Sequence, residues 1–206
     1  MNFTDQYLSG LDQIQYIDVE HRDDLPRPPA GMRYLDFIGG SLNLRCFLVP
    51  EALPRARFME EHSDALDPCL QPIYAADGIR IRQDASYALP GFYILSFEQQ
   101  YRSFDLIDPA LFFKAMVLCH RVRALMREHL SIEYIHLHYE EKPDASCNVH
   151  FWIMPVGMIQ GEQPKIIFEL DIRQYLGNFH FRDHKRRILE CNDIMRSALG
   201  RGAEVA

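Results

Sequence analysis

Hydrophobic and polar side chains alternate in two neighbouring segments of the chain, 134–140 and 148–155. Such alternation predicts strands that bury one face. The connection between them, 141–147, contains Pro143, which disrupts strand pairing, and the turn-forming Asp144 and Ser146. The sequence therefore predicts an antiparallel hairpin. Its polar positions are His136, His138 and Glu140 in the first strand and Asn148, His150 and Trp152 in the second.

The register of this hairpin decides which polar side chains meet, because a one-residue slip moves every side chain of a strand to the opposite face. If His138 lies opposite Asn148, then His136 lies opposite His150, and three imidazoles and an amide share one surface. If Tyr139 lies opposite Asn148, the two sets are separated by the sheet. The sequence leaves both registers open.

A long helix is predicted over 109–129, before the hairpin. Asp108 is a favourable N-cap, Pro109 suits the first helical position, and apolar residues recur at helical spacing. We expect Val149, Phe151 and Ile153 to pack beneath this helix, which leaves Asn148, His150 and Trp152 on the opposite face.

The rest of the chain predicts shorter elements around this unit. We expect a loop-rich arm over 1–35, two strands around Gly39–Gly40, a short helix over 55–65, strands at 79–84 and 91–97, a strand at 165–171 and a helix at 183–199. The expected class is α+β, with a mostly antiparallel, twisted sheet. The expected division is an N-terminal extension (1–72), a core (73–160) and a C-terminal strand and helix (161–206).

Composition limits the classes of partner. The 206 residues include 22 Lys and Arg against 29 Asp and Glu, a net charge of −7, which argues against an extended grip on nucleic acid. A small anionic ligand remains compatible. No apolar run reaches the length of about 18 residues that spans a bilayer, and the N-terminus has no pattern of a secretion signal. Five widely spaced cysteines do not resemble a disulfide framework, so we expect a reduced, cytoplasmic protein.

The second strand of the hairpin, Asn148-Val-His-Phe-Trp-Ile-Met-Pro155, resembles the signature of the histidine triad (HIT-like) superfamily of nucleotide hydrolases and transferases. That signature has three histidines at alternate positions, often followed by proline. Only the middle one, His150, is present here. The resemblance covers about residues 75–160 and implies a HIT-like sheet with one long helix packed on it.

The resemblance also implies roles for single residues. His150 would be the nucleophile that attacks the α-phosphorus of a nucleotide. Asn148 and Ser146 would contact phosphate, with His136 and Trp152 as further substrate-binding residues. Because the indole of Trp152 cannot shuttle a proton, the assistance to the leaving group that this position provides in the family is in doubt, and His138 is the expected substitute.

Three functions follow as alternatives. The first is a nucleotidyl hydrolase or transferase that uses His150 and needs no cofactor. The second is a catalytically depleted protein that still binds a small-molecule nucleotide. The third is a metal-dependent enzyme in which His136, His138 and His150 hold zinc or another divalent ion. The family commonly forms dimers, so a homodimer is expected. Each histidine also has a structural interpretation, as a hydrogen-bonded or solvated strand residue.

Overall fold

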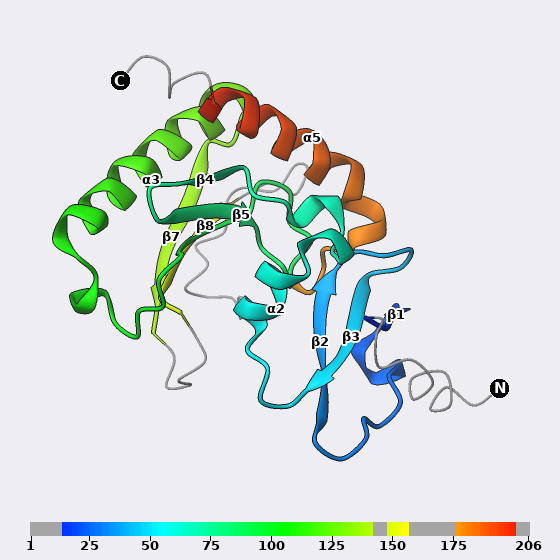
Figure 1. The fold of residues 1–206 in the computed structure, drawn as a ribbon. Coiled ribbons are helices and arrows are strands. Elements are labelled where there is room, and N and C mark those ends of the chain that lie inside the picture. The colour runs from blue at the N-terminus through cyan, green and yellow to red at the C-terminus, as the bar shows by residue number, and fades with distance from the viewer. Residues whose placement is uncertain (1–13, 142–147, 157–175, 201–206) are drawn as a thin grey trace.

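The computed structural model describes residues 14–141, 148–156 and 176–200, and within them the chain forms two antiparallel sheets (Figure 1). The larger sheet has five strands in the order β4-β5-β6-β8-β7. Their bounds are Tyr74–Ala76 (β4), Ile79–Gln83 (β5), Tyr93–Phe97 (β6), Tyr134–Glu140 (β7) and His150–Val156 (β8). The α+β class and the antiparallel sheet predicted from the sequence are confirmed.

The long helix α3 (Pro109–Leu130) covers one face of the five-stranded sheet. It begins at Asp108, whose side chain accepts hydrogen bonds from the backbone N–H groups of Ala110 (3.0 Å) and Leu111 (3.1 Å). It ends at Ser131, which takes the left-handed conformation (φ 57°). The buried side chains of α3 include Ala115, Leu118, Cys119, Val122 and Met126.

The smaller sheet has the order β1-β3-β2, with β1 at Tyr16–Val19, β2 at Met32–Ile38 and β3 at Leu44–Pro50. Helix α2 (Arg55–Glu61) follows it and buries Phe58 against Phe37 and Phe47. Short 3₁₀ turns lie at Arg22–Asp24, Ser63–Ala65, Pro68–Leu70 and Phe104–Leu106. This sheet and α2 form a second hydrophobic core, separate from the one beneath α3.

Helix α5 (Phe181–Gly200) joins the two cores. Phe181 and Ile188 pack in the core of the small sheet, whereas Cys191, Met195 and Leu199 pack in the core beneath α3. Figure 1 shows α5 and α3 following one another along the same side of the molecule. None of the described helices is long and apolar enough to cross a membrane.

Several elements differ from the sequence-based expectation. The arm expected to be loop-rich contains β1, which pairs with β3, and the strand β4 was not anticipated. The turn between β4 and β5 is a two-residue Asp77–Gly78 loop in which both φ values are positive (55° and 76°). The short helix ends at Glu61 rather than near residue 65. The strand expected at 165–171 lies outside the described residues.

Candidate functional site

The β7–β8 hairpin places the three singled-out histidines on one face of the large sheet. His138 lies opposite Trp152, and Glu140 lies opposite His150. This register differs by four residues from the first predicted alternative, in which His138 faced Asn148. A shift by an even number of residues keeps each side chain on the same face of the sheet. The first alternative was therefore wrong about which residues pair, but right that the three histidines share one face.

The other face of β8 packs against α3, as predicted. Val149, Phe151 and Ile153 are buried in the core that contains the inner side of α3. The rings of Phe151 and Phe112 lie 6.3 Å apart between centroids. His150 and Trp152 therefore point away from α3, because successive side chains of a strand alternate between faces.

His150 is half-buried, and its ring is oriented by the main chain. Its Nδ1 lies 2.9 Å from the carbonyl oxygen of Asn148. A carbonyl oxygen can only accept, so Nδ1 must donate and carry the hydrogen. In the neutral imidazole this leaves the lone pair on Nε2, which is the atom that a nucleophile needs.

The side chain of Asn148 holds the segment that follows β6. Its amide oxygen accepts from the backbone N–H of Tyr101 (2.9 Å), and its amide nitrogen donates to the carbonyl oxygens of Phe97 (2.8 Å) and Gln99 (3.3 Å). Both of its donor hydrogens are therefore engaged. Contact between Asn148 and a phosphate group requires one of these bonds to break.

His136 and His138 stack on one another, with ring centroids 5.5 Å apart. The Nε2 atom of His138 is buried and has no hydrogen-bond partner in the described part of the chain. Burial, with a smaller contribution from His138, lowers the pKa of His136. Ser146, the remaining predicted phosphate contact, lies outside the described residues.

Trp152 stands beside His150 and against an aromatic cluster. Its ring centroid is 6.1 Å from that of His150, and it meets Phe92 edge-on at 5.4 Å. Tyr87 makes a second edge contact at 6.4 Å. The indole N–H of Trp152 is buried and has no hydrogen-bond acceptor among the described residues.

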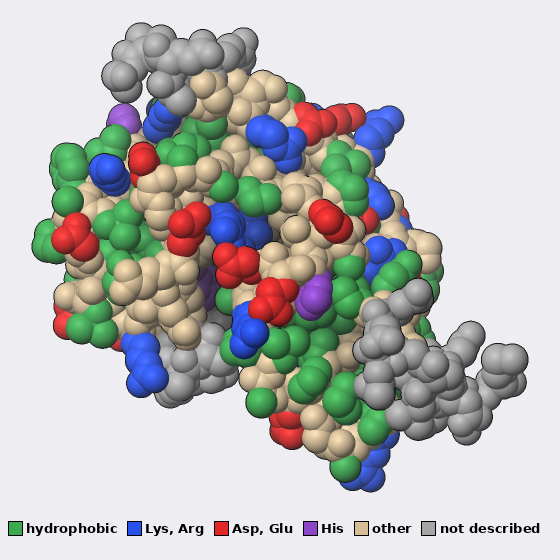
Figure 2. Space-filling view, viewed as in Figure 1, with side chains coloured by type: hydrophobic (Ala, Val, Ile, Leu, Met, Phe, Trp, Pro, Cys, Tyr) green, Lys and Arg blue, Asp and Glu red, His purple; other side chains and the backbone are tan. Residues whose placement is uncertain are grey.

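Two arginines of β5 share this face and were not singled out from the sequence. The cross-strand pairs align Arg80, Ser96 and His150 in one row, and Arg82, Ile94 and Trp152 in the next. The alternation of Ile-Arg-Ile-Arg at 79–82 was the signal that could have found them. Figure 2 shows basic side chains set deep in the surface near the middle of the molecule, with acidic side chains beside them.

No three His, Cys, Asp or Glu side chains of the described residues are arranged to hold a metal ion. His136 and His138 are adjacent through their stacked rings, but they and His150 do not form a three-ligand cluster. The described side chains thus offer no preformed metal centre.

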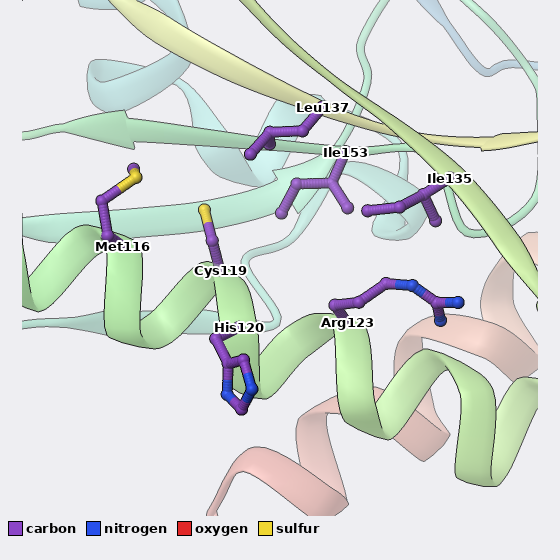
Figure 3. A pocket seen from close by; sticks show the side chains of 7 residues that line it. All are labelled: Met116, Cys119, His120, Arg123, Ile135, Leu137 and Ile153. Carbon is purple, nitrogen blue, oxygen red and sulfur yellow. The ribbon is translucent and has the colours of Figure 1, made fainter.

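A pocket of about 270 Å³ lies on the other side of the sheet, between α3 and the strands β7 and β8 (Figure 3). It is lined by Met116, Cys119, His120, Arg123, Ile135, Leu137 and Ile153. Ile153 and Leu137 belong to the face that packs on α3, so this pocket is separated by the sheet from His150.

No family model and no curated protein matches the sequence at a significant level. Solved structures do resemble it. A hypothetical histidine triad nucleotide-binding protein from Sulfolobus tokodaii strain 7 has a TM-score of 0.50, with 11% identity over 70% of this chain and 92% of that chain. A Hit-like protein involved in cell-cycle regulation from Bartonella henselae has a TM-score of 0.49, with 13% identity over 70% and 95% of the two chains. The diadenosine triphosphate hydrolase of Plasmodium falciparum has a TM-score of 0.46, with 12% identity over 66% and 80%.

At these identities the likeness concerns the fold, not the activity. The Sulfolobus protein is covered almost entirely, so the matched region is a whole fold rather than a fragment. In the present chain, strand β8, which carries His150, lies inside the sheet between β6 and β7. The chain therefore has a HIT-like fold.

Proposed function

We propose that the protein is a nucleotidyl hydrolase or transferase that acts on a nucleotide phosphoanhydride or phosphoester, with His150 as the nucleophile. The observation that carries the proposal is the hydrogen bond from His150 Nδ1 to the Asn148 carbonyl oxygen. It leaves the lone pair on Nε2, on the face of the sheet away from α3. The name of the Sulfolobus protein, which describes it as nucleotide-binding, supports a nucleotide as the ligand.

The reaction has two displacements. Nε2 of His150 attacks the α-phosphorus, a P–N bond forms, and the bond from phosphorus to the leaving oxygen breaks with its electron pair on that oxygen. Water, or the hydroxyl group of a second acceptor in a transferase, then attacks the same phosphorus and gives its proton to the group that protonated the leaving oxygen in the first step. The P–N bond breaks, its electron pair returns to Nε2, and the nucleotidyl group departs.

The leaving oxygen needs a proton or a positive charge, and His138 is our proposed source of the proton. Trp152 occupies the position of the third family histidine, and its N–H cannot shuttle a proton. His138 lies directly opposite Trp152. Its imidazole is therefore the titratable group that lies across the strand pair from the position of the missing third histidine. Positioned acid catalysis of this kind contributes about 10²–10⁴-fold.

The test is covalent labelling of the full chain with an adenylylating nucleotide analogue. We expect mass spectrometry to locate the adduct on His150, and His150→Ala to lose both the adduct and turnover while its circular dichroism is unchanged. His120→Ala, which removes an exposed imidazole on α3, is the matched control. Full activity of the His150→Ala variant would remove the proposal.

A second candidate, a depleted nucleotide-binding protein, is favoured by the presence of Trp152 at the third position of the signature. Because Trp152 is the only tryptophan, its fluorescence reports directly on ligands at this face. A fluorescence change with nucleotide, together with no adduct and no turnover, would favour this candidate. The metal-dependent alternative requires about one equivalent of a divalent ion to co-purify with the protein.

We also propose a homodimer, formed through β7 and the outer side of α3. Among the described strands, β7 lies at the edge of the five-stranded sheet, and its Leu137 is 49% exposed. Phe113 and Val117, on α3, are 69% and 52% exposed. A strand edge that pairs with no other described strand, together with exposed apolar side chains, is a surface that a second copy of the same chain can cover.

A further inference from the structure

Residues 84–87 form a loop that leaves β5, and the side chain of Asp84 shapes this loop from within. The buried carboxylate of Asp84 accepts hydrogen bonds from the backbone N–H groups of Ser86 (2.7 Å) and Tyr87 (2.8 Å). The side-chain amide of Gln83 donates to the carbonyl oxygen of Tyr87 at 3.2 Å. The main chain of Tyr87 is therefore held at both its N–H and its C=O group.

The small sheet and α2 bind the same loop from outside. Arg55, the first residue of α2, donates from Nη2 to the carbonyl oxygen of Ala85 (3.2 Å) and to Oγ of Ser86 (3.3 Å). The backbone N–H of Ile38, the last residue of β2, donates to the same carbonyl oxygen at 2.8 Å. Ala85 is itself buried in the core of the small sheet. Two elements on the small-sheet side therefore hold one loop of the large sheet.

The guanidinium group of Arg55 is oriented by an aromatic ring and by a carboxylate. Its Cζ atom lies 4.3 Å from the centroid of the Phe37 ring. Its Nη1 atom lies 3.7 Å from Oδ1 of Asp36. A planar guanidinium group can stack on a ring with its face and donate hydrogen bonds from its edge at the same time, whereas an ammonium group cannot. Arg55 therefore suits this position in a way that a lysine does not.

Asp84 is a counter-charge that the two sides of the molecule share. Burial raises the pKa of its carboxyl group, whereas the hydrogen bonds from Ser86 and Tyr87 and the attraction of Arg55 and Arg82 oppose this rise. Arg82 belongs to β5, and Arg55 belongs to α2. A buried carboxylate is stable only with such partners, so the loss of Arg55 weakens the loop from the side of the small sheet.

The ring of Tyr87 connects this loop to Trp152. It meets the indole edge-on, with ring centroids 6.4 Å apart, and lies nearly parallel to the ring of Phe92 at 6.3 Å. Phe92 meets the indole edge-on at 5.4 Å. Trp152 in turn lies beside His150, with 6.1 Å between their ring centroids. A shift of the loop therefore moves an aromatic ring that packs against Trp152.

We propose that Arg55 is a positioning residue: it holds the 84–87 loop, and with it Tyr87, so that the small sheet and α2 fix the orientation of Trp152 beside His150. The inference gives the small sheet and α2 a part in the site, which the proposed function does not. Its consequence for turnover rests on the proposed function, whereas the position of Trp152 does not. Such a residue can matter at a distance, because a displacement of about 1 Å can lower a rate about 10²-fold.

Fluorescence of the full chain tests the position of Trp152, which is the only tryptophan. We expect the acrylamide quenching constant of Arg55→Gln to be about twofold or more above that of the parent protein, because a loosened loop lets the quencher reach the indole. Arg57→Gln, which removes an exposed arginine of the same helix, should leave the constant unchanged. Parent-like quenching in Arg55→Gln would overturn the inference.

A variant that is destabilised elsewhere in the small sheet separates positioning from stability. Val49→Ala removes two methyl groups from the core of the small sheet, on its central strand. We expect it to lower the melting temperature and to leave the quenching of the folded protein unchanged. Increased quenching in Val49→Ala would mean that any weakening of this core exposes Trp152, and would overturn the specific role of Arg55.

The substitution Arg55→Lys separates the shape of the guanidinium group from its charge. The lysine keeps a positive charge near Asp84 and Asp36, but it cannot stack on Phe37 and hold the loop together. We expect its melting temperature to lie closer to that of the parent protein than that of Arg55→Gln does. Its quenching should rise as much as in Arg55→Gln. Parent-like quenching in Arg55→Lys would overturn the inference, because the planar group would then not be needed.

The substitution Tyr87→Leu tests the path from the loop to the indole. Alone, it should raise the quenching constant, because it removes a ring that packs on Trp152. Arg55→Gln added to Tyr87→Leu should raise the constant little further, because both changes act through the same ring. Fully additive effects of the two substitutions would contradict this path and overturn the inference.

The rate of adduct formation on His150 links the inference to the proposed function. We expect Arg55→Gln to slow this rate about tenfold and Arg57→Gln to leave it unchanged. An unchanged rate in Arg55→Gln would overturn the inference even with increased quenching, because Arg55 would then have no effect on the site. If no adduct forms in the parent protein, the proposed function fails, and the quenching measurements alone decide whether Arg55 positions Trp152.

Discussion

His138 and Trp152 lie directly opposite one another in the β7–β8 pair. Side chains in this relation have Cβ atoms about 4.5–5.5 Å apart. Each has a ring nitrogen, Nε2 in His138 and Nε1 in Trp152, that is buried without a hydrogen-bond partner in the described segments. Buried polar atoms without a partner are rare in folded proteins, so this pair calls for an explanation, and a catalytic role for His138 is the one tested below.

Replacement of His138 by glutamine should therefore depend on the leaving group. We expect His138→Gln to lower turnover at least about tenfold for a substrate with a poor leaving group, and much less for an activated one whose leaving group departs without a proton. The measurement is kcat for the two substrates under single-turnover conditions. Equal, small effects would show that His138 is structural and would favour the depleted binding protein.

A second imidazole at the opposite position provides a rescue. Trp152→His, introduced into the His138→Gln variant, places a titratable ring at the position of the third family histidine. We expect part of the lost turnover to return for the poor leaving group only. The same substitution also removes the edge contacts with Phe92 and Tyr87, so a lower melting temperature should accompany the rescue.

The substitution Asn148→Ala distinguishes the contribution of the Asn148 side chain from that of its main-chain carbonyl group. The substitution removes three hydrogen bonds to the 97–101 segment but keeps the carbonyl oxygen that orients His150. We expect a loss of about 1–3 kcal/mol in the free energy of unfolding, measured with urea. The adduct on His150 should still form. Unchanged stability with much weaker nucleotide binding would instead indicate that Asn148 contacts phosphate directly.

The stability of the protein should depend on His136 as the pH falls. Its folded-state pKa is lowered below the ordinary value of 6.5, so the unfolded chain binds a proton first. The contribution of neutral His136 is complete above about pH 6.5 and is lost as the pH falls through the lower, folded-state pKa. Urea unfolding at pH 7.5 and pH 5 should show a smaller pH effect in His136→Gln than in the parent protein. His120→Gln, on the exposed side of α3, should keep the full effect.

The proposed homodimer predicts that a charge on α3 separates the subunits. Phe113→Glu places a carboxylate on the exposed apolar surface beside β7, and we expect light scattering to give the monomer mass. Ile194→Glu, on the exposed side of α5, should leave the mass of the parent protein unchanged. A parent protein that is already monomeric at high concentration would refute the homodimer.

The sequence predicted the large sheet and its helix well because their signals are local. Each signal can be recognised within a few residues: the helical spacing of apolar residues in 109–129, the N-cap Asp108, and the alternation in 134–155. β1 could not be found in this way, because its partner β3 lies about 25 residues away and its residues alternate weakly. β4 was missed although the Asp77–Gly78 pair is a hairpin signal, because only three residues precede the turn as a strand.

The site was predictable only in part. His150 was singled out because the pattern of β8 resembles the histidine triad signature, and its role stays a prediction. The face that His150 shares with His138 required only that the register be shifted by an even number of residues. The engagement of the Asn148 side chain by Tyr101 is a contact 47 residues apart, which no local pattern encodes. Arg82 shares the face of Trp152 through two strand pairings, so its position there depends on the order of strands in the sheet, which no local pattern encodes.

The position of α5 has a consequence for how the chain acquires its structure during synthesis. The helix supplies Phe181 and Ile188 to one core and Cys191, Met195 and Leu199 to the other, yet it follows both sheets in the order of translation. A nascent chain that has emerged only as far as β8 would expose apolar surface on both halves at once. We expect such ribosome-bound intermediates to bind chaperones and to be cut readily by protease. Both properties should disappear once residues 181–200 emerge and α5 covers the exposed apolar surface of both hydrophobic cores.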